Sequence, residues 1–346
     1  MAHAALSQTL GQRTAGAARV KRLGIGMHSY GLHWKAGPFN DALSFLEYAH
    51  GLGAGGVQVS IGQRDAAYTR KLRDKWEGWG MYLEAQASLP ADESAVARFT
   101  SEVHTAQAAG ATVMRTAMLG GRRYETFKSM GEFETFAAKS WKSLMLAEPI
   151  LKKHGVRLAI ENHKDWMISE LLGIVRKISS EYVGICVDTG NSIALLEDPI
   201  AVVEAYAPFA FSTHIKDMGV AQYEHGFLLS EVPLGAGFLD LARMIQILER
   251  ANPKIQWNLE MITRDPLQIP YLQEKYWATF KSMPARQLAE AVAMVRAHEQ
   301  ALPRVSHLSD AEKLKAEDDN VRQSLAFFSS LYSNATKSNA PAARSP

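Results

Sequence analysis

Cysteine is nearly absent from this sequence, and so is any strong excess of charge of one sign. The single cysteine among 346 residues, Cys186, excludes an internal disulfide framework and a cysteine-based zinc cluster. Lys and Arg number 38 against 36 Asp and Glu, so the net charge of +2 supplies no general attraction for nucleic acid or for an anionic membrane. The composition therefore favours a small molecule as the partner.

Long hydrophobic runs are also missing. No segment approaches the roughly 18 apolar residues of a membrane-spanning helix, so we expect no membrane partner and a cytoplasmic protein. Residues 1–21 are rich in Ala, Gln and Gly but contain no continuous apolar stretch. We expect this segment to be a disordered lead-in, with a cleaved leader upstream of residue 20 as the alternative.

The apolar residues occur in short runs between longer segments with helical spacing. Hydrophobic residues make up 47% of the chain and charged residues 21%, which is typical of a globular protein. The alternation of short and long segments favours a parallel sheet with crossover helices. Eight segments are candidate strands: Leu23–Tyr30, Gly56–Ile61, Tyr82–Ser88, Thr112–Met118, Arg157–Asn162, Gly184–Asp188, Ala210–Lys216 and Gln256–Ile262.

Eight repeats of one pattern favour a closed barrel over an open sheet. The Gly-x-Gly-x-x-Gly motif of dinucleotide-binding sheets does not follow the first strand, because Gly24-Ile25-Gly26 lies inside that strand. We therefore predict the α/β class, a (β/α)8 TIM barrel forming a single catalytic domain over residues 22–303, with an additional C-terminal helix. The expected outer helices include Ala42–Leu52, Ala95–Ala108, Phe133–Lys153, Leu239–Leu248 and Ala285–Leu302.

A charged segment follows the predicted barrel. Ser309–Tyr332 begins with a Ser-Asp cap and ends in large apolar residues, which predicts a helix packed on the barrel through its last turns, within an extension of residues 304–333. A role of this helix in contacts between subunits of a homo-oligomer is the alternative. Residues 334–346 are rich in Ser, Ala and Pro, and we expect a disordered tail.

Each of the last four predicted strands ends in a side chain that binds cations in other proteins: Glu161, Asp188, His214 and Glu260. The carboxyl ends of parallel strands converge over the axis of a barrel, where active sites of this fold lie. Three carboxylates in a dry cavity repel one another unless a cation holds them, and one imidazole narrows the choice of metal. We predict one divalent metal ion, Mn²⁺ first, with Co²⁺, Mg²⁺ or Zn²⁺ as alternatives. For any one of these residues alone, capping a helix or pairing with an Arg is the competing interpretation.

Four motifs surround these residues: Ala159-Ile160-Glu161-Asn162-His163, Val187-Asp188-Thr189-Gly190-Asn191, Thr213-His214-Ile215-Lys216-Asp217 and Leu259-Glu260-Met261-Ile262-Thr263-Arg264-Asp265. In this order and spacing they resemble the xylose isomerase-like barrel superfamily. Its members include sugar isomerases and epimerases whose metal is held by Glu, Asp, His and Glu from consecutive strands. The likeness covers roughly Arg22–Ala301.

The resemblance implies a reaction. In the ketose epimerases of this superfamily, two metal-bound glutamates flank the substrate carbon and exchange its proton, and the matching positions here are Glu161 and Glu260. A bound cation stabilises the enediolate that forms after proton abstraction. The resemblance therefore implies a sugar or polyol isomerase or epimerase that transfers a proton next to a carbonyl, with a carbohydrate as substrate.

The sequence departs from those epimerases at two substrate-binding positions, which are occupied by Asn191 and Val220. His163 and Lys216, each two residues after a metal-binding position on the same strand, resemble elements of the inosose dehydratases. A dehydratase or lyase acting on a keto-sugar, 3-keto-glycoside or inosose is thus the alternative. The competing structural roles are a bond from His163 to a backbone carbonyl and an ion pair of Lys216 with Asp188 or Asp217.

Other candidates for the rim of the site carry weaker signals. Asn191 and Arg264 are predicted to bind substrate, although Arg264 has the alternative of pairing with Asp265. His28 and Gln86 follow or end early strands, and Trp34 is a candidate for stacking on a sugar face, with core packing as its alternative. Substrate specificity is expected in the loops Gly120–Lys128 and Met218–Gly237.

Two further functions compete with these enzymes. A nucleic-acid repair enzyme shares the barrel in this superfamily, but its three-metal cluster needs more histidines and the near-neutral charge argues against it. A metal-stabilised binding protein without turnover is the alternative from another class.

Overall fold

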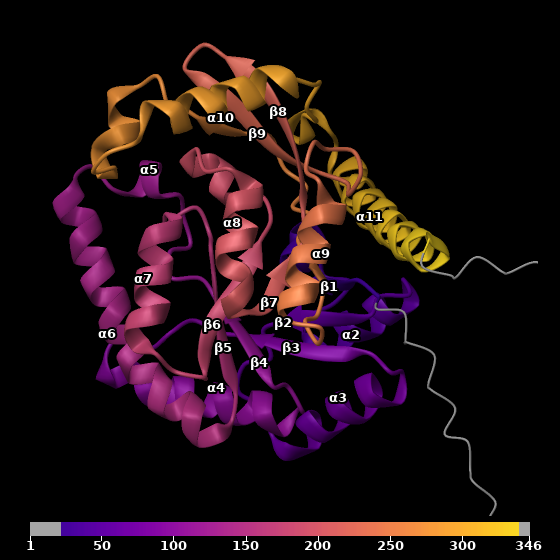
Figure 1. Cartoon of the computed structure of the whole chain (residues 1–346). Coiled ribbons are helices and arrows are strands. Elements are labelled where there is room, and N and C mark those ends of the chain that lie inside the picture. Colours follow the sequence, from indigo (N-terminus) through magenta and orange to yellow (C-terminus); the bar gives the residue numbers. More distant parts are fainter. Residues whose placement is uncertain (1–21, 339–346) are drawn as a thin grey trace, which may run out of the picture.

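The computed structural model describes residues 22–338, so the predicted lead-in of residues 1–21 and the end of the predicted tail, residues 339–346, lie outside the described residues. An eight-stranded parallel sheet forms the centre of the molecule, with helices around it (Figure 1). The strands follow in the order β10-β1-β2-β3-β4-β5-β6-β7. Their bounds are β1 Gly24–Gly26, β2 Gly56–Val59, β3 Tyr82–Gln86, β4 Val113–Thr116, β5 Arg157–Glu161, β6 Val183–Asp188, β7 Ala210–His214 and β10 Asn258–Leu259.

The sheet closes on itself between its first and last strands. A parallel bridge joins Ile215, directly after β7, to Leu259 of β10, and the Ile215 amide donates to the Asn258 carbonyl at 2.7 Å. The predicted TIM barrel is therefore confirmed, and all eight predicted strands overlap an observed one. The first strand is shorter than predicted, because residues Met27–Tyr30 turn into a 3₁₀ helix, η1.

Small and large residues fit together at the amino-terminal end of the barrel. Tyr82 of β3 crosses the interior and donates from its hydroxyl to the Trp257 carbonyl at 2.7 Å. Gly24 and Gly56 make room for this ring, because a Cβ at Gly24 would lie 2.2 Å from the Tyr82 hydroxyl and one at Gly56 would lie 2.5 Å from the ring. These glycines in the first two strands allow a filled core beneath the rim.

Helices cover the outside of the barrel (Figure 1). Their apolar faces are buried, as in α9, where Met244 and Leu248 lie one turn apart in the core. The helices are α1 Gly31–Ala36, α2 Ala42–Gly51, α3 Ala66–Gly78, α4 Val96–Ala108, α5 Arg123–Thr126, α6 Met130–His154, α7 Ile168–Ile178, α8 Pro199–Tyr206, α9 Leu241–Ala251, α10 Ala285–Ala297 and α11 Asp310–Ser338.

A small antiparallel sheet stands at the carboxyl-terminal rim, where the sequence analysis expected a loop. The hairpin β8 (Asp217–Tyr223) and β9 (Gly226–Val232) pairs with β11 (Leu267–Ile269). The expectation of a loop over Met218–Gly237 is thus corrected, because the Phe227 and Leu229 side chains are buried against the rest of the rim. Helix α10 lies across this hairpin, and the Gln300 amide that follows it donates to the Val220 carbonyl at 2.9 Å.

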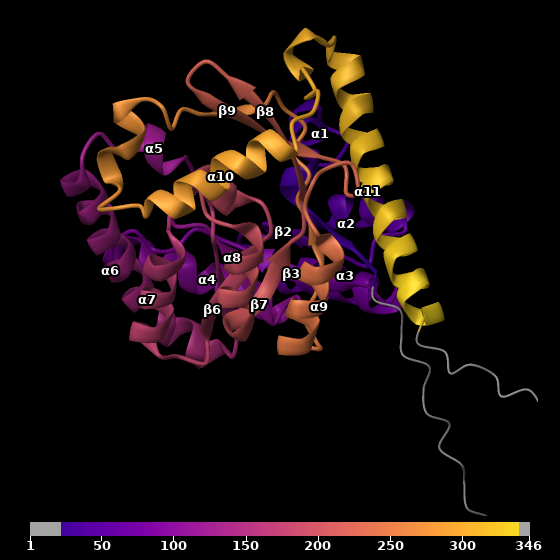
Figure 2. The same cartoon turned by 45° about the horizontal axis from the view of Figure 1, so that its top comes forward.

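The C-terminal helix α11 runs along one side of the barrel (Figure 2). It packs through more than its last turns, because Val321 and Phe328 are both buried and Glu317 is only 1% exposed. The Glu317 carboxylate accepts bonds from the Leu32 and His33 amides, at 2.8 and 2.9 Å, and from the His33 ring at 2.7 Å. The helix reaches Ser338, five residues past the predicted end of the extension. It therefore holds the segment that follows β1.

Candidate metal centre and active site

Four side chains meet at the carboxyl ends of β5, β6, β7 and β10. They are Glu161, Asp188, His214 and Glu260, and one ligand atom from each lies within 4.8 Å of the others. The strand register explains the meeting, because Asp188 pairs directly with His214, and Glu260 follows the last residue of β10. All four are buried. The side chains predicted to bind metal thus face one another over the barrel axis.

Hydrogen bonds orient two of these side chains before any ion binds. The His214 Nε2 and the Gln58 Oε1 are 2.7 Å apart, so Nε2 donates and leaves the Nδ1 lone pair toward the carboxylates. The Asp188 Oδ1 accepts from the Gly190 and Asn191 amides, at 2.9 and 2.7 Å, which turns Oδ2 toward the centre. Neither His214 Nδ1 nor Asp188 Oδ2 makes a hydrogen bond with the described residues, although both are buried.

This donor set fits a divalent cation. The Nδ1 of His214 lies 3.4 Å from one oxygen of Glu161 and 3.4 Å from one oxygen of Glu260, with the Asp188 Oδ2 at 3.8 Å. Three carboxylates and one imidazole are ligands that manganese, magnesium, cobalt and zinc accept. A buried acceptor without a hydrogen bond costs free energy, and a cation would remove that cost at the His214 Nδ1.

Two basic side chains contact Glu161 and Glu260. They contact the oxygen of each glutamate that is not the one nearest His214. The Lys216 Nζ lies 2.6 Å from the Glu260 Oε2 and 2.9 Å from the Asp188 Oδ2, and Arg115 of β4 donates to the Glu161 Oε2. Burial raises the pKa of Glu260, but nearby positive charge, that of Lys216 included, outweighs burial and holds this pKa well below its usual range. Lys216 therefore forms the ion pair with Asp188 that was its competing structural role, and it forms a second ion pair with Glu260.

A second lysine that the sequence analysis missed lies beside the first. The Lys164 Nζ donates to the Asn191 Oδ1, which also accepts from the Lys216 Nζ at 3.2 Å. The side-chain amide of Asn191 in turn donates from Nδ2 to the Glu161 Oε1 at 2.9 Å. Burial lowers the pKa of Lys164 to about 7, and the Lys216 charge adds to this. Its only sequence signal is its place two residues after a predicted strand, which a surface lysine shares.

The remaining predicted residues divide between the site and its surroundings. The Nδ1 of the half-buried His163 has no hydrogen-bond partner among the described residues, and burial, together with the Lys164 charge, keeps the pKa of His163 well below the usual value. Arg264 pairs with Glu231 at 2.6 Å instead of Asp265, and Glu231 lies 3.8 Å from Lys216. Trp34 packs against Phe39 and Phe45, with ring centroids 4.9 and 5.6 Å away.

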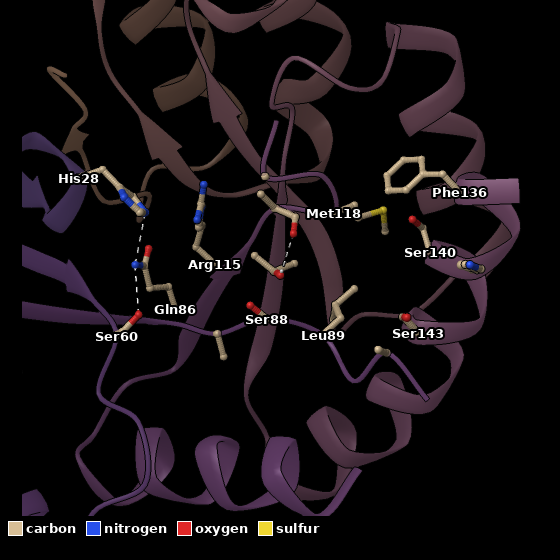
Figure 3. A pocket seen from close by; sticks show the side chains of 16 residues that line it. His28, Ser60, Gln86, Ser88, Leu89, Arg115, Met118, Phe136, Ser140 and Ser143 are labelled. Atoms are coloured by element: carbon tan, nitrogen blue, oxygen red, sulfur yellow. Dashed lines mark hydrogen bonds between the residues drawn. The ribbon is translucent and has the colours of Figure 1, made fainter. Parts of the chain in front are cut away.

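A cavity of about 600 Å³ opens beside the metal centre (Figure 3). At its inner end the Gln86 Nε2 lies 3.4 Å from the His28 ring and 3.2 Å from the Ser60 hydroxyl, and Arg115 completes this end. Burial lowers the pKa of His28 to about 4, although the Glu260 charge opposes it. The Gln86 Oε1 and the Arg115 Nε have no hydrogen-bond partner among the described residues. This end of the cavity therefore contains two buried polar atoms that lack a partner.

Comparison with known proteins places the chain in a family. The model of the xylose isomerase-like TIM barrel family matches residues 46–298, and the chain belongs to this family. It is similar to the 3-oxo-isoapionate decarboxylase of Pectobacterium atrosepticum, at 28% identity over 237 residues that cover 65% of this chain and 81% of the relative.

Solved structures share the fold at lower identity. An L-ribulose 3-epimerase matches with a TM-score of 0.56 and 14% identity, over 94% of this chain and 100% of its own. A xylose isomerase-like TIM barrel protein from Mycobacterium smegmatis, crystallised with magnesium, matches with a TM-score of 0.53 and 14% identity, over 79% of this chain and 98% of its own. Within residues 22–338, no helix is long and apolar enough to cross a membrane.

Proposed function

We propose that this protein is a divalent-metal-dependent isomerase or epimerase of a sugar or polyol, acting by proton transfer next to a carbonyl. The observation that carries the proposal is the placement of Glu161 and Glu260 in one donor set, each with an oxygen 3.4 Å from the His214 Nδ1. A cation at this site, with Mn²⁺ as the first expectation, supplies the positive charge that stabilises an enediolate.

The surroundings of the two glutamates support their roles as proton acceptor and donor. Arg115 pairs with Glu161 and Lys216 pairs with Glu260, and the lowered pKa of Glu260 keeps its carboxylate ionised and able to accept a proton from the substrate carbon. Lys216 and His163 are proposed to assist at the reacting carbon. Asn191, Arg264, His28, Gln86 and Trp34 are proposed to bind the substrate. Among these, Gln86 has the clearest support, since its buried carbonyl oxygen is unpaired.

Solvent exchange tests the proposal. The Mn²⁺-loaded protein in deuterium oxide is expected to incorporate deuterium at a carbon beside the carbonyl of a ketose or keto-sugar, followed by NMR. Glu260→Gln should keep the bound metal, measured by elemental analysis, and lose about 10²-fold or more in exchange rate, because general acid–base groups contribute about 10² to 10⁴. The matched control is Glu224→Gln, whose side chain is 85% exposed. The proposal fails if no keto-sugar exchanges, or if Glu260→Gln exchanges at the wild-type rate.

Decarboxylation of a 3-oxo sugar acid is the second candidate. The four carboxylates of Glu161, Asp188, Glu231 and Glu260 lie among Arg115, Lys216, Arg264 and Lys164, so a divalent ion leaves one positive charge to spare, and a second one when Lys164 is protonated. That surplus suits an anionic substrate. In this reaction the bond between the α-carbon and the carboxylate carbon breaks, its electron pair enters an enolate, carbon dioxide leaves, and a proton is added at the α-carbon.

The similar decarboxylase adds support to this second candidate. Release of carbon dioxide from a 3-oxo sugar acid, without deuterium exchange into ketoses, would select decarboxylation over isomerisation. Elimination of water from a keto-sugar would instead produce an enone absorbance, and the ion pairs of Lys216 give it no added support.

A further inference from the structure

The cavity beside the metal centre continues well past the residues that face the metal. Its inner end holds His28, Gln86 and Arg115, and its outer end reaches helix α6 between the loops that follow β3 and β4 (Figure 3). A volume of about 600 Å³ lies within the range of about 300–1,000 Å³ typical of pockets for drug-sized ligands. A sugar held against the metal centre leaves the outer end free.

The outer end is built from an unusual stretch of α6. Phe136, Ser140 and Ser143 are four and three residues apart, so they share one face of the helix, and this face lines the cavity. Further along the helix, Leu144 and Leu151 are buried in the core. Hydroxyl groups thus occupy positions on α6 where apolar packing would be expected of a barrel helix.

These hydroxyls have no partners. Ser140 and Ser143 are only 7% and 9% exposed, and neither side chain forms a hydrogen bond within residues 22–338. Figure 3 shows both side chains, with Phe136, facing across the cavity toward Leu89 and Met118. Both hydroxyls line the cavity and are not among the fully buried polar atoms that lack a partner, so a ligand or water in the cavity can bond to them.

We propose that the outer end of this cavity binds a second sugar unit, so that the substrate is a keto-sugar carrying a glycosyl group. The chemistry of the lining fits a sugar ring, because two hydroxyls offer donors and acceptors while the Phe136 face and Met118 cover the apolar C–H side. This inference rests on the proposed function and names its substrate class.

Binding of two simple probes tests the inference. The Mg²⁺-loaded full chain is titrated by calorimetry with fructose and with lactulose, a ketose that carries a galactosyl group. Lactulose is expected to bind at least about tenfold more tightly. Ser143→Leu fills the outer end and should reduce lactulose affinity to that of fructose, while fructose affinity stays unchanged. The double variant Ser140→Ala/Ser143→Ala should lose part of the preference.

The matched control is Ala138→Leu, an exposed position on the same helix, which should keep the preference for lactulose. Equal affinity for the two sugars, absence of binding by both, or a preference that survives Ser143→Leu would each overturn the outer site. Failure of the proposed function has another signature: no deuterium exchange into any keto-sugar by the metal-loaded protein, whatever the binding preference.

Discussion

Some titratable side chains in this protein are buried where their surroundings disfavour the charged form. Glu197 illustrates this outside the metal centre. Its Oε1 accepts from the Ile168 amide at 2.9 Å at the start of α7, but its Oε2 is buried without a hydrogen bond among the described residues. Burial raises the pKa of the Glu197 carboxyl to about 8, although the Ile168 bond opposes it. The native state therefore holds this proton at pH values where the unfolded chain has released it.

This residue makes stability depend on pH. An acid whose folded pKa is raised contributes stability that is complete below about pH 4.5 and is lost as the pH rises toward about 8. Glu197→Gln cannot ionise, so we expect it to exceed the wild type by at least about 1 kcal/mol at pH 8.5, since one pKa unit corresponds to about 1.4 kcal/mol. The two proteins should agree near pH 4.5. Urea unfolding over this pH range measures the difference.

The control for this prediction is Glu204→Gln on the neighbouring helix α8, where the carboxylate is 52% exposed and pairs with Arg243. An exposed pair contributes little, so this variant should follow the wild-type pH profile. Parallel pH profiles of Glu197→Gln and the wild type would contradict the interpretation.

Residues of the site differ in how well the sequence predicts them. Glu161, Asp188, His214 and Glu260 were predictable because each ends a strand and parallel strands end together. The roles of Gln58 and Lys164 were not, because each depends on a partner contributed by another strand: His214 for Gln58, and Asn191 for Lys164. The carboxylate partner of Arg264 was mistaken for the same reason.

At the scale of secondary-structure elements, the C-terminal helix α11 lies outside the repeating strand–helix pattern of the barrel. Hydrogen bonds attach it to the segment after β1 and to helix α2. The Glu317 carboxylate bonds two amides and one ring of the segment after β1, and the Tyr30 and Tyr48 hydroxyls both donate to Asp318, at 2.8 and 2.9 Å. The sequence predicted the helix from its cap and its apolar end. It did not predict these attachments, because a Glu-Asp-Asp run is typical of a solvated helix face.

Substitution of Glu317 tests how much the hydrogen bonds between α11 and the segment after β1 stabilise the fold. Glu317→Ala leaves the Leu32 and His33 amides without their acceptor, so we expect a loss of about 2–4 kcal/mol in the free energy of unfolding. Asp319→Ala is the control, because its pair with Lys315 is exposed and should contribute under about 1 kcal/mol. Equal midpoints of the two variants in guanidinium unfolding would show that the attachment does not stabilise the fold.

Elements of the rim were harder to predict than those of the barrel. The barrel strands are short apolar runs, whereas the β8–β9 hairpin contains Met218-Gly219-Val220-Ala221-Gln222, which has no clean alternation of apolar and polar residues. The other edge of β9 pairs with β11, which is 35 residues further along the chain. Local pattern alone does not reveal such a partner.

At the scale of the whole molecule, the candidate metal centre takes its four donors from the ends of four of the eight barrel strands. A cation that binds the native state and not the unfolded chain stabilises the protein by about 4 kcal/mol when its concentration is 1,000 times its dissociation constant. We therefore expect EDTA to lower the melting temperature by several degrees and Mn²⁺ to restore it. Differential scanning calorimetry measures both changes.

A variant of one donor sharpens this prediction. His214→Ala removes the only imidazole among the four donors and should make the melting temperature insensitive to EDTA, whereas His225→Ala, at an exposed histidine, should respond like the wild type. An EDTA response that persists in His214→Ala would place the stabilising metal elsewhere.

The attachment of α11 also bears on the order in which the molecule becomes active. Leu32 and Glu317 are 285 residues apart in sequence, yet they share a hydrogen bond a few residues from His28. During synthesis the early strands emerge long before the helix that fixes their first loop. Until α11 docks, the segment around His28, at the inner end of the cavity, lacks this support. We therefore expect the nascent barrel to bring its metal ligands together before the inner end of the sugar-binding cavity is in place.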